Sequence, residues 1–176
     1  TGERLKTTPG VRAVVLSGEG RAFCAGLDTA NFGKMASGER GGARLLKGER
    51  TPGGANPPQH TVMVWRELPV PVIAAVHGVA YGGGFQLMLA ADIRFMAADT
   101  RLSIMEINWG LVPDMGGMAL LHGLVRDDVA RELTYTGRVF DGNEAARLGL
   151  ATRVGADPYA DALALASEIA ARPPKA

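Results

Sequence analysis

Apolar, β-branched runs alternate with helical patterns along the chain. The runs at residues 11–16 and 70–76 indicate buried strands, and shorter strands are expected at residues 92–96, 101–104 and 151–154. Apolar residues at helical spacing predict helices at residues 29–36, 59–68, 85–91, 117–124, 127–136, 143–148 and 158–171. Strands that alternate with helices predict a single α/β domain over residues 1–176.

The segment at residues 37–58 has no such periodicity. It is rich in Gly, Pro, Arg and Lys, which are typical of surface turns. We interpret it as a mobile loop. A proline pair then precedes the expected helix at residues 59–68, and Asp127 is expected to cap the helix at residues 127–136.

Two glycine-rich segments follow the two longest apolar runs. The first is Ala-Phe-Cys-Ala-Gly-Leu-Asp at residues 22–28, and the second is His-Gly-Val-Ala-Tyr-Gly-Gly-Gly-Phe-Gln at residues 77–86. Glycine lets a ligand approach the backbone closely, and the second segment opens a helix whose first N–H groups have no partner within the helix. Two strand ends that offer N–H groups predict an oxyanion hole, a site that holds an oxygen as it gains negative charge.

Composition and charge favour an ordinary globular domain. The chain has 176 residues, 47% of them hydrophobic, and a net charge of +1, so nothing indicates a nucleic-acid partner. Its apolar runs are too short for a membrane span, and the N-terminus lacks the apolar core of a signal peptide. The only cysteine, Cys24, has no partner for an internal disulfide and is expected to pack as a core residue. We therefore expect a cytoplasmic protein.

These segments resemble the crotonase (enoyl-CoA hydratase/isomerase) family. Matching motifs run in order over most of the chain: residues 11–18, 22–28, 77–86, 91–94, 110–113 and 144–150. The resemblance implies a crotonase-like ββα spiral core and an acyl-CoA thioester as substrate, with no cofactor beyond the coenzyme A of that substrate. It also implies that the N–H groups of Leu27 and Gly83 polarise the thioester carbonyl, and that Ala25 and Leu27 contact coenzyme A.

Two further expectations come from the same resemblance. Family members usually have an additional strand and helix before the segment that matches residue 11, and additional helices beyond residue 171, so we expect a core truncated at both ends. Members are commonly trimers or pairs of trimers, which predicts a homotrimer or a dimer of trimers.

Three polar positions carry the chemistry that the resemblance implies. Hydratases of the family activate a water with two glutamates, and these positions hold Gln86 and Glu106 here. Because an amide does not exchange protons at neutral pH, Gln86 is expected to position water or substrate, and hydration is disfavoured. In the branch that resembles dienoyl-CoA isomerases, acidic residues at the positions of Glu106 and Asp114 move a proton along the acyl chain. We therefore favour isomerisation of a double bond.

The residues alone leave the roles of these carboxylates open. Gly110 and Pro113 break any helix between Glu106 and Asp114, so the chain could fold back and bring both carboxylates to one pocket, as a proton donor and an acceptor. In the alternative, Glu106 is a charge at a helix N-terminus and Asp114 is the N-cap of the helix that begins near residue 116. Spacing favours this alternative, whereas the family resemblance favours the catalytic pair.

Other functions remain as alternatives. Enoyl-CoA hydration in fatty-acid β-oxidation is one, and a non-catalytic acyl-CoA-binding protein is another, since it would keep the glycine turns and lose carboxylates. A dinucleotide site is disfavoured because Phe23 stands where a third glycine is needed. The histidines His60, His77 and His122 lack ligand spacing, so no metal site is expected, and His77 is expected to bond the backbone.

Overall fold

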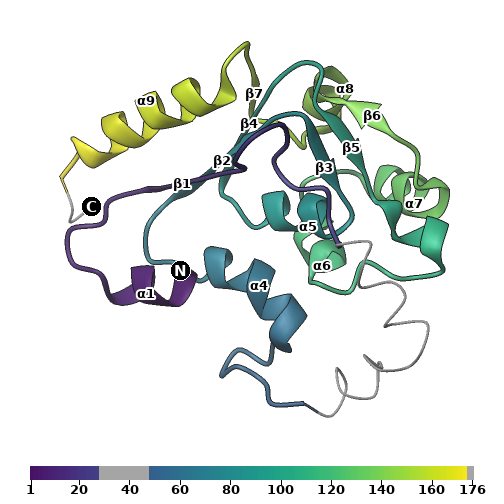
Figure 1. Cartoon of the computed structure of the whole chain (residues 1–176), viewed down its shortest axis with the longest axis horizontal. Helices are drawn as coiled ribbons and strands as arrows, with labels where there is room; N and C mark the ends of the chain where they lie inside the picture. The colour runs from purple at the N-terminus through teal and green to yellow at the C-terminus, as the bar shows by residue number, and fades with distance from the viewer. Residues whose placement is uncertain (28–47, 174–176) are drawn as a thin grey trace.

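The computed structural model describes residues 1–27 and 48–173, and its strands form two small sheets (Figure 1). The larger sheet is parallel, with the order β1-β2-β4-β7. In the smaller sheet, of order β3-β5-β6, β3 and β5 are parallel and β6 is antiparallel to β5. The strands are β1 (Val14–Ser17), β2 (Val72–Val76), β3 (Val79–Tyr81), β4 (Ile93–Met96), β5 (Arg101–Ser103), β6 (Phe140–Asp141) and β7 (Arg153–Val154).

The chain passes from the larger sheet to the smaller sheet twice in the same way. β2 leads directly into β3 and then into α5 (Gly83–Leu89), and β4 leads into β5 and then into the 3-10 helix η1 (Met105–Trp109). This repeat of two strands and a helix agrees with the ββα core that the family resemblance implies, and its alternation of strands and helices agrees with the predicted α/β class. It places the N-terminus of α5 and the N-terminus of η1 after neighbouring, parallel strands β3 and β5.

Strand β2 forms the centre of the core. All five of its residues are buried, and alternate side chains face opposite sides of the sheet. Val72, Ala74 and Val76 belong to the larger core with α5, whereas Ile73 and Ala75 pack with Ala162 and its neighbours on α9 (Pro158–Ala170). Figure 1 shows α9 on one side of the larger sheet and α5 on the other. Burial on both faces explains why this strand is a continuous apolar run in the sequence.

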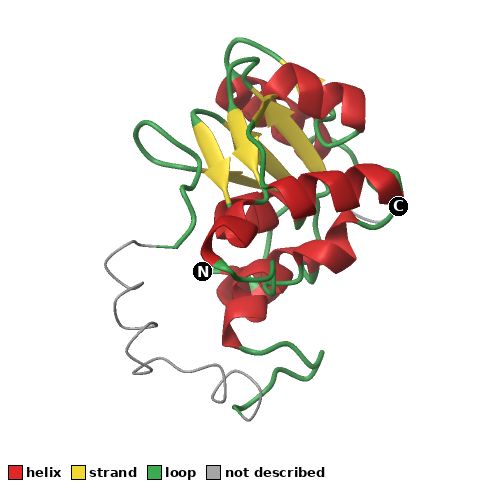
Figure 2. Ribbon diagram, turned by 90° about the vertical axis from the view of Figure 1, so that its right-hand side faces the viewer, coloured by secondary structure: helices red, strands yellow, loops and turns green. Residues whose placement is uncertain are grey.

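The remaining helices of the described residues pack on several sides of the two sheets, and loops flank the strands on the left of Figure 2. These helices are α1 (Gly2–Thr7), α4 (Pro57–Arg66), α6 (Gly117–Leu121), α7 (Asp127–Thr136) and α8 (Gly142–Leu148). Helix α4 begins with a capping box, in which the Asn56 side chain accepts from the Gln59 N–H and the Gln59 side chain accepts from the Asn56 N–H. None of the helices in the described part of the chain is long and apolar enough to span a bilayer.

Most predicted elements are found within three residues of their predicted ends. The sequence patterns missed α1, β3, η1 and β6, which are short. The predicted helix at residues 29–36 and residues 37–47 of the predicted loop lie outside the described residues. The loop was extended too far, because the Asn56 cap starts α4 at residue 57. The predicted cap at Asp127 was also wrong, since the N-cap of α7 is Arg126.

A close approach at Gly84 gives a test of this core. A Cβ at Gly84 would lie 2.1 Å from the Cys24 carbonyl oxygen and 2.8 Å from the Cys24 Cβ. Because the backbone oxygen cannot move away freely, we expect Gly84→Ala to lower the free energy of unfolding by about 3 kcal/mol or more. Gly53→Ala is the control, since its Cβ would meet the flexible end of Glu67 at 3.2 Å and the Thr51 hydroxyl at 3.9 Å, and its effect should stay within about 0.5 kcal/mol. Urea denaturation measures both, and equal effects would contradict the packing argument.

Candidate active site

The two glycine-rich segments lie against each other. The Cys24 N–H donates to the Val79 carbonyl and the Tyr81 N–H donates to the Cys24 carbonyl, each at 3.1 Å. Gly26 has a φ of +89°, which side chains rarely adopt, and a Cβ there would lie 2.7 Å from the Tyr81 oxygen and 3.4 Å from the Gly83 nitrogen. The end of the first segment therefore lies beside the first residue of α5.

This contact brings together the two N–H groups proposed for the oxyanion hole. Gly83 is the first residue of α5, so its N–H has no partner within the helix, and the N-cap residue Gly82 offers no side-chain acceptor. Among the hydrogen bonds between described backbone groups, none uses the N–H of Leu27 or of Gly83. Ala25 and Leu27 are exposed, as contact with coenzyme A requires. The roles of these three residues stay predictions.

Gln86 is buried behind this turn, on the first turns of α5. Its exposed fraction is 2%, and its side-chain oxygen accepts two backbone hydrogen bonds, from Met115 N–H at 2.9 Å and from Gly117 N–H at 3.0 Å. Its Nε2 donates to Oε1 of Glu106 at 2.7 Å. The amide thus joins α5, the start of α6 and η1. Sequence reasoning missed Met115 and Gly117, because they act through backbone groups that leave no signal in the residue type.

Glu106 lies in the first turn of η1 and is 9% exposed. Burial raises the pKa of its carboxyl group, and the negative charge of Asp114 raises that pKa further, whereas hydrogen bonds from the backbone and from Gln86 lower it. Its second oxygen, Oε2, is buried, and no hydrogen-bond donor to it is found among the described residues. A buried carboxylate with an unused oxygen can accept a proton from a substrate carbon.

Asp114 lies in the turn between η1 and α6 and is exposed. The helix is interrupted between the two carboxylates, because η1 ends at Trp109 and its C-cap, Gly110, has a left-handed φ of +65°. Asp114 does not cap α6, whose N-cap is Gly116 with no side-chain hydrogen bond. Its charge acts on Glu106, which is consistent with a shared site. The catalytic role of the pair stays a prediction.

Two other residues considered in the sequence analysis, His77 and Cys24, make structural contacts. His77 Nε2 lies 3.0 Å from the carbonyl oxygen of Gly20, so the prediction of a backbone hydrogen bond is confirmed. Cys24 packs against the larger core, as predicted.

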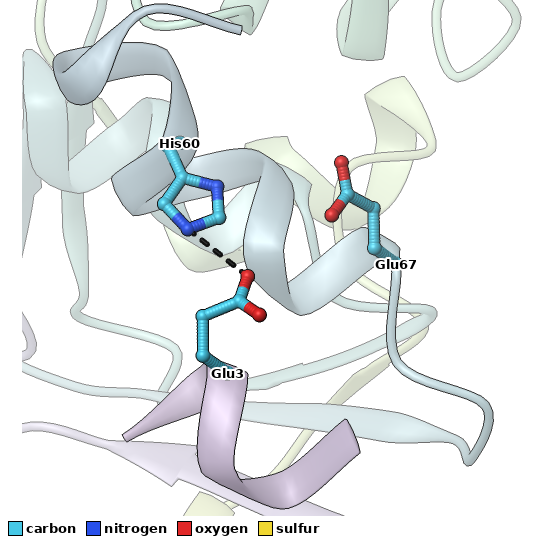
Figure 3. Close-up of side chains that lie close together, drawn as sticks. All are labelled: Glu3, His60 and Glu67. Carbon is cyan, nitrogen blue, oxygen red and sulfur yellow. Dashed lines mark ion pairs between the residues drawn. The ribbon is translucent and has the colours of Figure 1, made fainter. Parts of the chain in front are cut away.

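A second group of titratable side chains joins α1 to α4. Glu3, His60 and Glu67 offer ligand atoms that all lie within 4.8 Å of one another (Figure 3). However, Lys6 Nζ contacts Oε1 of Glu3 at 2.8 Å and Oε2 of Glu67 at 2.6 Å, and His60 Nε2 lies 3.1 Å from Glu3. The ammonium already compensates the carboxylate charges, so these contacts are explained as ion pairs that hold α1 against α4.

Comparison with known proteins identifies the class to which this fold and site belong. The family model for enoyl-CoA hydratase/isomerase matches residues 3–176, and the chain therefore belongs to that family. A solved enoyl-CoA hydratase/isomerase from Mycobacterium paratuberculosis has a TM-score of 0.85 and 30% identity, over 99% of this chain and 66% of that one. The predicted crotonase fold is thus confirmed.

The relatives carry the names of different enzymes. The chain is 34% identical to the peroxisomal Delta(3,5)-Delta(2,4)-dienoyl-CoA isomerase of Arabidopsis thaliana, over 85% of this chain and 54% of the relative. It is also 34% identical to the mitochondrial methylglutaconyl-CoA hydratase of Homo sapiens, over 99% of this chain and 50% of the relative. The chain thus spans about half the length of these relatives, and they do not decide between isomerase and hydratase.

The burial of Glu106 predicts how stability changes with pH. Its pKa is higher in the folded chain than in the unfolded chain, so the folded state binds more protons between these two values and loses stability as pH rises through them. Glu106→Gln removes this loss. We therefore expect the unfolding free energy of the variant, relative to the natural protein, to increase from pH 4 towards neutral pH. Glu19→Gln, at an exposed carboxylate, is the control. Chemical denaturation at several pH values measures the difference, and a constant difference would contradict the burial argument.

Proposed function

We propose that the protein acts on acyl-CoA thioesters and moves a carbon–carbon double bond along the acyl chain. The observation that carries the proposal is the buried Glu106 carboxylate. No described residue donates a hydrogen bond to its Oε2, and its neighbour at position 86 is an amide instead of a second carboxylate. Such a site can take and return a proton but has only one buried group to activate a water.

The proposed reaction needs no net gain or loss of atoms. A carboxylate removes a proton from the carbon next to the thioester carbonyl, and the electron pair of the C–H bond moves to form a dienolate. The N–H groups of Leu27 and Gly83 hold the negative oxygen of this dienolate. A carboxyl group then donates a proton to a carbon further along the chain, and the double bond is left in its new position. In this proposal Glu106 and Asp114 are the two acid–base groups.

Hydration of an enoyl-CoA is the second candidate function. Gln86 weighs against it, whereas the hydratase names among the relatives favour it. Isomerisation needs proton transfer by carboxylates but no activated water. It therefore fits the described side chains better than hydration does. We propose no cofactor besides the coenzyme A of the substrate. The homotrimer or dimer of trimers stays a prediction, as does the cytoplasmic location, because named relatives are mitochondrial or peroxisomal.

The oxyanion hole can be tested at Gly83. Proline is tolerated in the first turn of a helix, so Gly83→Pro should fold while losing the N–H group. Gly83→Ala keeps the N–H and adds the same Cβ, which would lie 3.1 Å from the flexible Met115 sulfur. We expect kcat to fall roughly a hundredfold or more in the proline variant, beyond any effect of alanine. If the proline variant folds and turns over substrate as fast as the alanine variant, the N–H of Gly83 is excluded as a donor.

The acid–base pair is tested by assaying the complete protein on 3,5-dienoyl-CoA and on 2-enoyl-CoA side by side. Glu106→Gln and Asp114→Asn should each slow isomerisation by about 10²- to 10⁴-fold with little change in binding of the CoA ester. The double variant should be little slower than either single variant, because both break one proton transfer. Full activity of Asp114→Asn would leave Glu106 as the only acid–base residue.

Gln86→Glu distinguishes the two candidate functions. The variant restores a carboxylate at the position where hydratases of the family carry their first glutamate, so we expect hydration of 2-enoyl-CoA to increase at least tenfold. If the natural protein already hydrates 2-enoyl-CoA as fast as the variant, hydration replaces isomerisation as the favoured function.

A further inference from the structure

The contacts of the Gln86 side chain fix which way its amide points. Only an oxygen can accept hydrogen bonds, and Met115 N–H and Gly117 N–H both donate to the same end of the amide. The other end must therefore be the NH₂ group, and this group faces Glu106 Oε1 at 2.7 Å. The amide can turn over only by losing all three of these hydrogen bonds.

The space around Gly117 is shaped to the same side chain. A Cβ at Gly117 would lie 2.6 Å from Gln86 Cγ and 2.8 Å from Gln86 Oε1, so any larger residue would push the amide out of place. Gly117 is the first residue of α6, and it is buried. The oxygen end of the amide is therefore held by backbone groups and by the contact with Gly117, and its NH₂ end contacts the Glu106 side chain.

The Glu106 carboxylate has two oxygens in different surroundings. Oε1 accepts the hydrogen bond from Gln86, whereas Oε2 is buried and has no donor within residues 1–27 and 48–173. Both oxygens lie close to the turn before α5, since a Cβ at Gly82 would be 3.5 Å from Oε1 and 3.8 Å from Oε2. Gly82 directly precedes Gly83, the residue proposed to donate to the thioester oxygen. The unused oxygen thus lies near the place where the reacting carbons would be.

We propose that Gln86 is a positioning residue, which holds Oε1 of Glu106 so that Oε2 alone exchanges the proton with the substrate. This inference rests on the function proposed above and assigns the roles of the two oxygens within it. A glutamate at position 86 would accept the same two backbone hydrogen bonds, but it would place a second carboxylate against Oε1, and the pair would have to share a proton. The amide leaves Glu106 free to act as a single base.

The first experiment is made on the unsubstituted protein, with one variant as a control. NMR of the protein with labelled glutamine and glutamate side chains follows the Glu106 carboxyl carbon and the Gln86 NH₂ group as pH changes. If the Gln86 amide donates to Glu106, its proton and nitrogen signals should shift with the same midpoint as the Glu106 carbon. The charge of Asp114 also acts on Glu106. The Asp114→Asn variant separates the effect of that charge on the Glu106 midpoint from the effect of the Gln86 hydrogen bond. Signals of Gln86 that do not follow Glu106 would overturn the proposal.

The second experiment displaces the amide in two independent ways. Gln86→Met removes the donor, and Gly117→Ala forces the natural amide away; Ala119→Ser, on the exposed face of α6, is the control. In both test variants we expect the acidic limb of the pH profile to move upward by roughly one pH unit, because Glu106 loses a hydrogen bond to its ionised form. We also expect kcat to fall about tenfold while KM changes less than twofold.

The outcomes separate this inference from the proposed function. If the natural protein turns over neither substrate, the proposed function fails, while the NMR midpoints still report the contact between Gln86 and Glu106. If the protein is active and the folded variants keep both the natural pH profile and the natural Glu106 midpoint, Gln86 has only a packing role and the inference is overturned. If neither variant folds, the measurement on the unsubstituted protein decides.

Discussion

The backbone pairing of Cys24 with β3 is the interaction on which the site depends. Its two hydrogen bonds, to Val79 and from Tyr81, join segments that are more than fifty residues apart in the sequence. Pairing of this kind is specific because each buried N–H and C=O must find a partner when water is excluded. It needs a surface without side chains, and Gly84 provides one against the Cys24 carbonyl. The glycines of the second segment therefore serve the assembly of the backbone as well as the proposed approach of a ligand.

The position of Glu106 shows a conflict between stability and chemistry. A buried carboxylate with one unpartnered oxygen is unfavourable for folding, since desolvation of a charge is costly unless other groups compensate it. Among the described groups, Gln86 donates a hydrogen bond to one of the two oxygens, and a backbone hydrogen bond also favours the ionised form. Groups of this kind are concentrated at functional sites, because a carboxylate that is weakly solvated takes up protons more readily than one in water.

The sequence predicted the architecture well because the main strands and helices bury long apolar patterns. The run at residues 70–76 and the Gly-rich turn after it are visible without a structure. The short elements β3 and η1 were missed because three to five residues carry too little periodicity. The family resemblance pointed to Gln86 and Glu106, but no pattern indicated that backbone N–H groups of Met115 and Gly117 hold the amide. Contacts made by the backbone do not depend on residue type, so sequence patterns do not record them.

The two backbone donors that hold residue 86 also affect how such a site can diverge. They recognise an acceptor oxygen, and the side chains of glutamine and glutamate present one with the same reach and nearly the same shape. The position between α5 and α6 can therefore hold either a glutamine or a glutamate side chain. A single exchange between them would alter the number of ionisable groups beside Glu106 without any rearrangement of the core. Under the proposed function, one substitution at this position would change which proton transfers the site can carry out.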